Sequence, residues 1–200
     1  MLNTAFTLLG TAVTWLELIA FALALASIAC NVFEIHWAWP LTIIASALYA
    51  WLFYASKLYG EAGVNIFFAI TAIWGWQQWL RGYRKGSGAP LRIVRLPISG
   101  IVLTALAWAA LWLAFAYLLR AITDSDVPWA DGFVTAGSVV GTVLLARKFI
   151  ANWPVWLIVN AASVLLFVHK GLQLTVVLYG IFFLLAIWGW AGWTKRFDAL

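Results

Sequence analysis

The stretch IWGWQQW at residues 73–79 returns as IWGWAGW at residues 187–193, 114 residues later. The same offset aligns residues 15–79 with residues 129–193 without a gap, and 16 of these 65 positions are identical. A chain of this apolar composition gives about five identities by chance. The sequence is therefore a tandem duplication, and each copy ends in the same Trp-Gly-Trp segment.

The composition places the chain in a lipid bilayer. Hydrophobic residues make up 66% of it, charged residues 10%, and the mean hydropathy is +0.98, whereas soluble domains carry about 25% charged residues. Apolar runs of nearly membrane-spanning length, about 20 residues, follow one another along the chain. We predict an all-α polytopic membrane protein with seven transmembrane helices, at residues 13–33, 38–57, 61–80, 97–119, 129–147, 152–169 and 172–193.

The spans divide as three, one and three. Two copies of three spans joined directly would have opposite orientations, but the unpaired fourth span restores the orientation of the first copy. The result is a 3+1+3 parallel repeat, as in transporters of the SWEET type, whose substrate sites lie near the midplane between repeats. The predicted parts are an interfacial N-terminal segment at 1–13, a three-helix repeat at 14–82, a basic cytoplasmic linker with the fourth helix at 83–128, and the second repeat at 129–196.

Positive residues orient the protein, because they accumulate on the cytoplasmic side of membrane proteins. An extracellular N-terminus and a cytoplasmic C-terminus put nine Lys and Arg residues inside and three outside. The net charge of +5 follows from this topology, since the basic residues lie between apolar runs and form no nucleic-acid-binding face. The nine inside are Arg81, Arg84, Lys85, Arg92, Arg95, Arg147, Lys148, Lys195 and Arg196.

The sequence lacks the residue patterns of an enzyme or a metal site. Cys30 is the single cysteine, so neither an intrachain disulfide nor a cysteine-based metal site can form. Every Asp and Glu lies near a predicted helix end, as do His36 and His169. We expect no catalysis, metal or cofactor, and no coupling ion, because coupled transporters keep ionisable residues within their spans.

Matched stripes run along the second and sixth spans at the spacing i, i+3, i+7, i+10 of one helix face. In the second span the stripe consists of Trp39, Thr42, Ser46, Tyr49 and Phe53, and its register mates are Trp153, Trp156, Asn160, Ser163 and Phe167. Facing each other, the stripes would line a cavity with aromatic rings and polar groups; alternatively, the hydroxyls bond to their own helix. An amide in mid-membrane, such as that of Asn160, needs a partner on a neighbouring helix or on a substrate.

The third and seventh spans carry a second repeated set. Asn65 and Trp76 are eleven residues apart, about three helical turns, and share a face, as do their mates Tyr179 and Trp190. The opposite faces carry Trp74 and Trp188, and the sequence leaves open which set meets the pore. The predicted substrate-binding residues are Asn160, Trp156, Ser163, Ser46, Tyr49, Asn65, Trp76, Tyr179 and Trp190.

The remaining residues of the Trp-Gly-Trp segments have structural interpretations. Trp79 and Trp193 lie beside basic residues at the cytoplasmic boundary, which predicts an aromatic belt. Gly75 and Gly189 allow close helix contact. A pore walled by Trp, Tyr and amide side chains without a deep acid favours a flat ring, and a cationic ring gains about 0.5 to 2 kcal/mol from each well-placed aromatic face.

The series Arg147-Lys148, Asn152-Trp153, Trp156 and Asn160, together with the repeated Trp-Gly-Trp, resembles the PnuC family of bacterial vitamin transporters, relatives of the SWEET carriers. The resemblance covers nearly the whole chain. It implies uptake of nicotinamide riboside across the bacterial inner membrane by facilitated diffusion. A cytoplasmic kinase, not stably bound, then traps the vitamin by phosphorylation.

The resemblance also implies a homotrimer, and it leaves alternatives open. Similar branches carry thiamine or riboflavin, so these vitamins are alternative substrates. A non-transporting receptor or assembly subunit is a third interpretation. Besides the vitamin, the lipid bilayer and copies of the chain itself, the sequence indicates no stably bound partner. The basic residues are scattered between apolar runs, which excludes nucleic acid.

Overall fold

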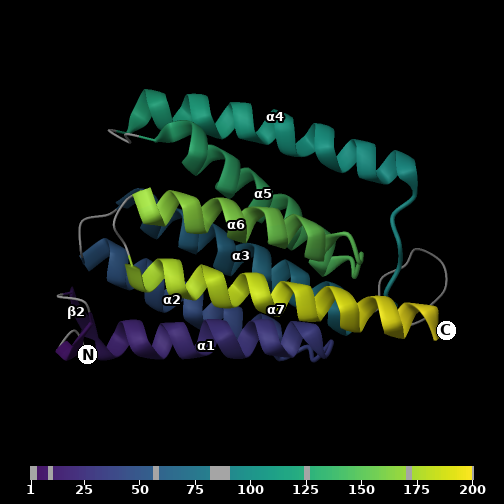
Figure 1. Cartoon of the computed structure of the whole chain (residues 1–200), viewed down its shortest axis with the longest axis horizontal. Helices are drawn as coiled ribbons and strands as arrows, with labels where there is room; N and C mark the ends of the chain where they lie inside the picture. Colours follow the sequence, from purple (N-terminus) through teal and green to yellow (C-terminus); the bar gives the residue numbers. More distant parts are fainter. Residues whose placement is uncertain are drawn as a thin grey trace. The chain divides into compact units, whose positions relative to one another are not determined.

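The computed structural model describes residues 4–8, 11–55, 59–81, 91–123, 127–169 and 173–199. It divides into two units, Met1–Arg81 and Gly82–Leu200, which are described separately. The elements are shown in Figure 1 and comprise β1 (Thr4–Leu8), β2 (Thr11–Thr14), α1 (Trp15–Val32), α2 (Ala38–Ala55), α3 (Tyr59–Arg81), α4 (Ile98–Ile122), α5 (Pro128–Ala146), α6 (Asn152–His169) and α7 (Gln173–Asp198).

Seven helices at the predicted positions confirm the all-α membrane architecture. In the described part of the chain, α4, α5, α6 and residues 176–198 of α7 are long and apolar enough to cross a bilayer, and α1 and α2 contain shorter apolar stretches. The third helix, α3, contains Asn65, Gln77 and Gln78 and is the least apolar of the seven. Pro40 and Pro154 lie in the first turns of α2 and α6, where a missing N–H breaks no helical hydrogen bond.

The N-terminal segment contains two strands that the sequence did not predict. Strands β1 and β2 pair antiparallel, with an irregularity in register between Thr4 and Phe6. Both strands fall at the predicted interfacial segment, 1–13, apart from Thr14. The position of this segment relative to the membrane stays a prediction.

The duplication is repeated in the packing of each unit. In unit 1, α2 packs against both α1 and α3, and in unit 2, α6 packs against both α5 and α7. The middle helix of each repeat is thus the one that carries the predicted polar stripe. Unit 2 also contains α4, which lies along α5 (Figure 1).

The turns that precede the two middle helices have the same backbone geometry. Glu34 and Lys148, 114 residues apart, are the described non-glycine residues with positive φ, 59° and 54°. At each turn the N–H of this residue bonds to the carbonyl three residues before it, and the next N–H bonds five residues back, over 2.9–3.1 Å. This is the Schellman pattern, which ends a helix in one left-handed residue. The turn is therefore duplicated although its side chains differ.

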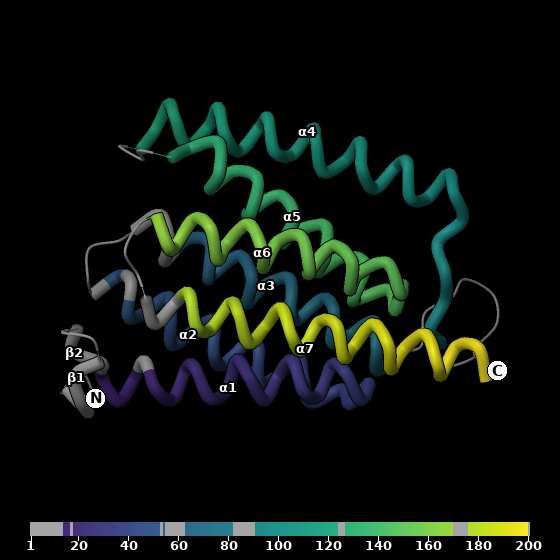
Figure 2. The backbone as a smooth tube through the Cα atoms, viewed as in Figure 1, coloured from purple at the N-terminus to yellow at the C-terminus, as the bar shows by residue number. Residues whose placement is uncertain are grey.

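Residues 91–97 form a strap across the turn between α5 and α6. The N–H of Val94 donates to the carbonyl of Lys148 and the N–H of Ile150 donates to the carbonyl of Val94, both over 3.0 Å. In Figure 2 the segment that leads into α4 begins beside the last turns of α7. This part of the predicted linker is a packed segment, and residues 82–90 lie outside the described residues.

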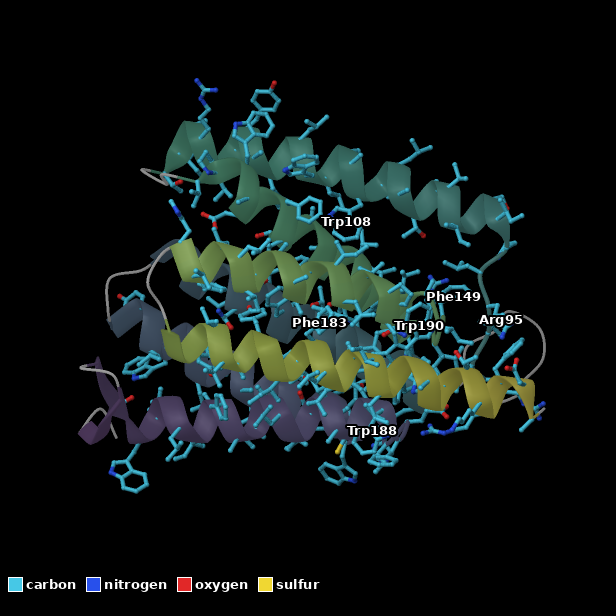
Figure 3. All side chains as sticks on the ribbon, viewed as in Figure 1. Arg95, Trp108, Phe149, Phe183, Trp188 and Trp190 are labelled. Carbon is cyan, nitrogen blue, oxygen red and sulfur yellow. The ribbon has the colours of Figure 1, made fainter. Side chains whose placement is uncertain are left out.

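Side chains fix the strap on both of its faces. Leu91 and Ile93 are buried. Arg95 pairs with Asp198 at the end of α7 over 2.9 Å, and its guanidinium lies 4.9 Å from the ring centre of Phe197 (Figure 3). Because both charged side chains are more than half exposed, the ion pair contributes little free energy. The buried leucine and isoleucine hold the strap more strongly.

Aromatic rings join α4 to α5. Trp108 stacks on Phe133 at 5.0 Å between ring centres, and its Nε1–H donates to the carbonyl of Phe133 over 3.1 Å (Figure 3). A turn further along α4, the Nε1–H of Trp112 donates to the carbonyl of Trp129 over 2.7 Å. Both residues are half-buried, and both indole N–H groups are satisfied by backbone carbonyls. Trp108 also packs against the buried cluster of α5 and α6, formed by Val140, Leu144, Val155 and Val159.

Candidate functional site

The polar stripe of α6 lies in the interior of the protein. Asn160 is 3% exposed and Ser163 is 0% exposed. The two residues are three apart, so they lie about one helical turn from each other on neighbouring parts of one face. The hydroxyl oxygen of Ser163 has no hydrogen-bond partner among the described residues. A buried polar atom without a partner costs about 1–3 kcal/mol, so this hydroxyl is suited to a ligand or a water molecule.

Contacts of the aromatic members show where the stripe faces. The ring of Trp156 lies against Gly141 of α5: a Cβ on that glycine would be 3.0 Å from Cε2 of the indole. Phe167, at the other end of the stripe, stacks on Tyr179 of α7 at 5.2 Å between ring centres. The stripe therefore runs between the contact with α5 and the contact with α7, and Asn160 lies between these two aromatic residues along α6.

The matching stripe of α2 is only partly available for a substrate. The hydroxyl of Thr42 donates to the carbonyl of Ala38 over 2.9 Å, so for this residue the alternative of bonding to its own helix holds. Ser46 is buried, whereas Tyr49 is half-buried and already has an interaction partner. The side chain of Phe53 lies outside the described residues. That the α2 and α6 stripes face each other stays a prediction.

Within unit 2 the two deep tryptophans of α7 lie on different sides of the helix. Tyr179 contacts α6, and Trp190, eleven residues later, lies on the same face by helical geometry. Trp188 projects to the opposite side (Figure 3). Both indoles are exposed, by 43% and 51%. The face that the sequence assigned to the site is thus the one on the α6 side.

In unit 1, Trp76 and Asn65 occupy the matching positions on α3. Both are half-buried. The Nε1–H of Trp76 is buried and has no hydrogen-bond partner among the described residues, and Asn65 already has an interaction partner. An unpaired indole donor adds to the case for a ligand near this face.

Each Trp-Gly-Trp segment holds a tryptophan from the preceding helix. A Cβ on Gly75 would overlap the ring of Trp39, and a Cβ on Gly189 would overlap the ring of Trp153. Each ring also makes an edge contact with the last tryptophan of its segment. The ring centres are 5.6 Å apart for Trp39 and Trp79 and 5.4 Å apart for Trp153 and Trp193. The prediction that these glycines allow close helix contact is confirmed, and what approaches the glycine is an indole ring. We call this arrangement the indole seat.

The indole seat corrects the prediction that Trp193 belongs to an aromatic belt. Trp193 is 0% exposed and packs against Trp153, so assigning it to the membrane boundary is wrong. Its mate Trp79 packs in the same way against Trp39. Neighbouring basic residues suggested a boundary position, but the side chain points inward from the last turns of α7. A belt residue, in contrast, needs its ring at the lipid surface.

Both seated tryptophans leave a polar group without a partner. The Nε1 atoms of Trp39 and Trp153 are buried and unpaired among the described residues. The side-chain oxygen of Asn152, at the start of α6, is also buried and has no hydrogen-bond partner among the described residues. The sequence analysis did not assign Asn152 or Gly141 to the site, although Asn152 belongs to the series that carries the family resemblance and Gly137-x-x-x-Gly141 is a small-residue spacing that marks helix contacts in membranes.

The residues of the site are suited to binding a ligand. In the described part of the chain no three His, Cys, Asp or Glu residues are grouped to hold a metal ion. The acidic residues of the helices, Glu17, Glu61, Asp131 and Asp198, lie in their first or last turns. Partly exposed indole rings together with a buried amide and a buried hydroxyl can hold a flat ring with attached hydroxyl groups.

A separate apolar cavity of about 540 Å³ lies between α4, α5 and α6. It contains none of the nine predicted site residues. Its lining is almost entirely aliphatic and aromatic, which does not suit a hydroxyl-rich molecule. The lining residues are Trp112, Val127, Trp129, Ala130, Phe133, Val134, Ala162, Leu165, Leu166 and His169.

Comparison with known proteins agrees with this picture. Residues 14–195 match the family model described as nicotinamide mononucleotide transporter. The chain belongs to the nicotinamide mononucleotide transporter family. This match spans both repeats and α4.

Two characterised members illustrate the range of the nicotinamide mononucleotide transporter family. The chain is 27% identical to the riboflavin/roseoflavin transporter RibM of Streptomyces davaonensis over 197 residues, which cover 97% of this chain and 91% of RibM. It is 26% identical to the nicotinamide riboside transporter PnuC of Escherichia coli over 179 residues, 76% of this chain and 73% of PnuC. The chain is therefore a vitamin transporter of the PnuC family.

A solved structure supports the fold. The crystal structure of the vitamin B3 transporter PnuC superposes with a TM-score of 0.76 at 20% identity, covering 90% of this chain and 81% of that chain. At this identity the likeness concerns the fold alone. Membership of a transporter family with several apolar helices agrees with a multi-pass membrane protein that is not an enzyme.

Proposed function

We propose that this protein imports nicotinamide riboside across the bacterial inner membrane by facilitated diffusion. Phosphorylation by a cytoplasmic kinase, which needs no stable contact with the carrier, would then trap the vitamin. The observation that carries the proposal is the α6 stripe, where the half-buried Trp156 is followed by the buried Asn160 and by the buried, unpaired hydroxyl of Ser163.

The stripe matches both halves of this vitamin. Its pyridinium ring is flat and cationic, and an indole face stabilises such a cation by about 0.5 to 2 kcal/mol. Its ribose carries hydroxyl groups, which pair with the amide of Asn160 and the hydroxyl of Ser163. The amide offers both donors and an acceptor, and a hydroxyl offers one donor and two acceptor sites.

Uncoupled transport follows from where the acids lie. A proton- or sodium-coupled carrier keeps an ionisable group at membrane depth, whereas the helical acids of this chain lie in the first or last turn. Transport by this protein is therefore expected to follow the vitamin gradient alone. The direction is set in the cell by the kinase, because phosphorylation keeps the inner vitamin concentration low.

Riboflavin is the second candidate, favoured by a specific observation. The similarity to RibM extends over 97% of this chain, more than the 76% covered by PnuC of Escherichia coli. The isoalloxazine ring of riboflavin is flat and uncharged, and its ribityl chain carries hydroxyl groups like those of ribose. The same stripe therefore suits both vitamins. Thiamine, which is also a cationic aromatic compound, is the third vitamin to be tested.

The deciding experiment measures binding and flux with the same purified protein. Thermal shifts are recorded with nicotinamide riboside, nicotinamide mononucleotide, riboflavin and thiamine, and the vitamin that stabilises the protein is then followed into proteoliposomes without an ion gradient. We expect saturable uptake that equilibrates and is unchanged by a proton or sodium gradient. Binding without flux would indicate a non-transporting receptor, and gradient-driven accumulation would contradict the uncoupled mechanism.

Assembly and orientation complete the proposal. We propose a homotrimer with the N-terminus outside and the C-terminus in the cytoplasm. The protein mass in detergent, determined by light scattering, tests the first statement. Labelling of single cysteines placed at Arg120 and Arg196 of a cysteine-free variant tests the second, because a membrane-impermeant reagent added outside should reach only the former.

A further inference from the structure

Trp156 has a defined position because of a single glycine in the neighbouring helix. Gly141 is buried in α5, and a Cβ placed on it would lie 3.0 Å from Cε2 and 3.2 Å from Nε1 of the indole. Real Cβ atoms seldom have contacts this short. Any side chain at position 141 therefore requires the ring to shift by a few tenths of an ångström.

The pair exists in only one of the two repeats. The register mate of Trp156 is Thr42, whose hydroxyl bonds to the carbonyl four residues before it, and the mate of Gly141 is Ser27, whose hydroxyl bonds three residues back. Neither mate can supply a ring. The duplication has thus been altered at two matching positions, and both alterations are needed to seat an indole next to the amide of Asn160.

The contact differs from the other glycine contact of α5. One turn earlier, a Cβ on Gly137 would overlap the ring of Trp108 and the side chain of Val159, which belong to the packing of α4, α5 and α6. Gly137 therefore holds the helices together. Gly141 instead holds a residue of the polar stripe, one turn from Asn160.

We propose that Gly141 is a positioning residue that sets the room available to the aromatic ring of the vitamin. It does so by letting the indole of Trp156 lie back against α5. A methyl group at position 141 shifts the indole and so displaces the aromatic wall beside Asn160. A vitamin with a wide fused ring then loses more binding affinity than a vitamin with a single ring. The proposal rests on the proposed function, because Gly141 has this role only if the α6 stripe binds the vitamin.

A double-mutant cycle on the full-length purified protein tests the role of Gly141. Dissociation constants for nicotinamide riboside and riboflavin are measured by calorimetry for the wild type, Gly141→Ala, Trp156→Phe and the double variant. We expect Gly141→Ala to weaken binding about tenfold, a loss of about 1.4 kcal/mol, with the larger loss for riboflavin. In the Trp156→Phe background the smaller ring leaves room for the methyl group, so the same change should weaken binding less than about twofold.

The matched control is Gly137→Ala, in the same helix and also under an indole. It should lower the melting temperature without changing the ratio of the two dissociation constants. Equal loss of binding from Gly141→Ala in both backgrounds, or no loss in the wild-type background, overturns the role of Gly141 alone. If the wild type binds neither vitamin, the proposed function fails and this inference fails with it.

Discussion

The indole seat makes a prediction about four glycines. Gly75 and Gly189 each lie under a tryptophan ring, whereas a Cβ on Gly63 or Gly180 would meet nothing within 4 Å. All four lie inside helices. Alanine is favoured over glycine within a helix by up to about 1 kcal/mol, so substitution at the two open positions should stabilise the protein slightly.

At the seated positions the sign is expected to reverse. An added methyl group in a packed interior costs about 1–3 kcal/mol, and the upper end applies because the ring is buried and is held at its edge by Trp79 or Trp193. Subtracting the gain in helix propensity leaves a net loss of about 1–2 kcal/mol. For a chain of this length that lowers the melting temperature by about 2–8 °C.

The assay is thermal unfolding followed by tryptophan fluorescence, in one detergent and at one scan rate, since unfolding of such proteins is often irreversible. Gly75→Ala and Gly189→Ala should both lower the transition temperature, and Gly63→Ala and Gly180→Ala should leave it unchanged or raise it. Trp39→Leu should remove most of the effect of Gly75→Ala. If Gly75→Ala and Gly189→Ala raise the transition temperature as Gly63→Ala and Gly180→Ala do, the ring does not lie on the glycine and the reasoning is refuted.

Three further predictions concern the stripe, the strap and α4. Asn160→Leu and Trp190→Ala should each weaken vitamin binding at least about tenfold, and unchanged affinity of both folded variants would reject this placement of the site. Val94→Pro removes an N–H that donates to the turn between α5 and α6 over 3.0 Å; it should lower the melting temperature, whereas Val94→Ala, which keeps the N–H, should have a smaller effect. Trp108→Phe keeps a ring against Phe133 but loses the 3.1 Å bond to its carbonyl; a loss of about 1 kcal/mol is expected, and an unchanged melting temperature would argue against that bond.

The sequence predicted the helices because hydropathy and the 114-residue offset act over long stretches of chain. It also identified Gly75 and Gly189 as contact positions, since a glycine between two tryptophans has no side-chain role of its own. What touches those glycines could not be predicted, because spacing along one helix says nothing about the neighbouring helix. The error about Trp193 has the same origin. The neighbouring basic residues indicate how deep the residue lies in the membrane, but they do not indicate whether its side chain points to the lipid or to the interior.

The candidate site was predictable in part. Periodicity placed Asn160 and Ser163 on one face of α6, and both are buried. Thr42 followed the same periodicity but bonds to its own helix, a choice that depends on side-chain torsion and leaves no trace in the sequence. The strap was missed because its apolar residues, at 91, 93, 94 and 96, form only a short run that Arg92 and Arg95 interrupt and that Pro97 ends, and so short a run does not define a helix or a strand.

The strap also imposes an order on the making of the protein. Residues 91–97 enter the membrane region with α4, but the backbone groups of Lys148 and Ile150 that receive Val94 are synthesised more than 50 residues later. Arg95 meets Asp198 only after a further helical hairpin has followed. During translation the first turn of α4 must therefore stay undocked, and unit 2 can reach its final packing only once α7 has left the ribosome.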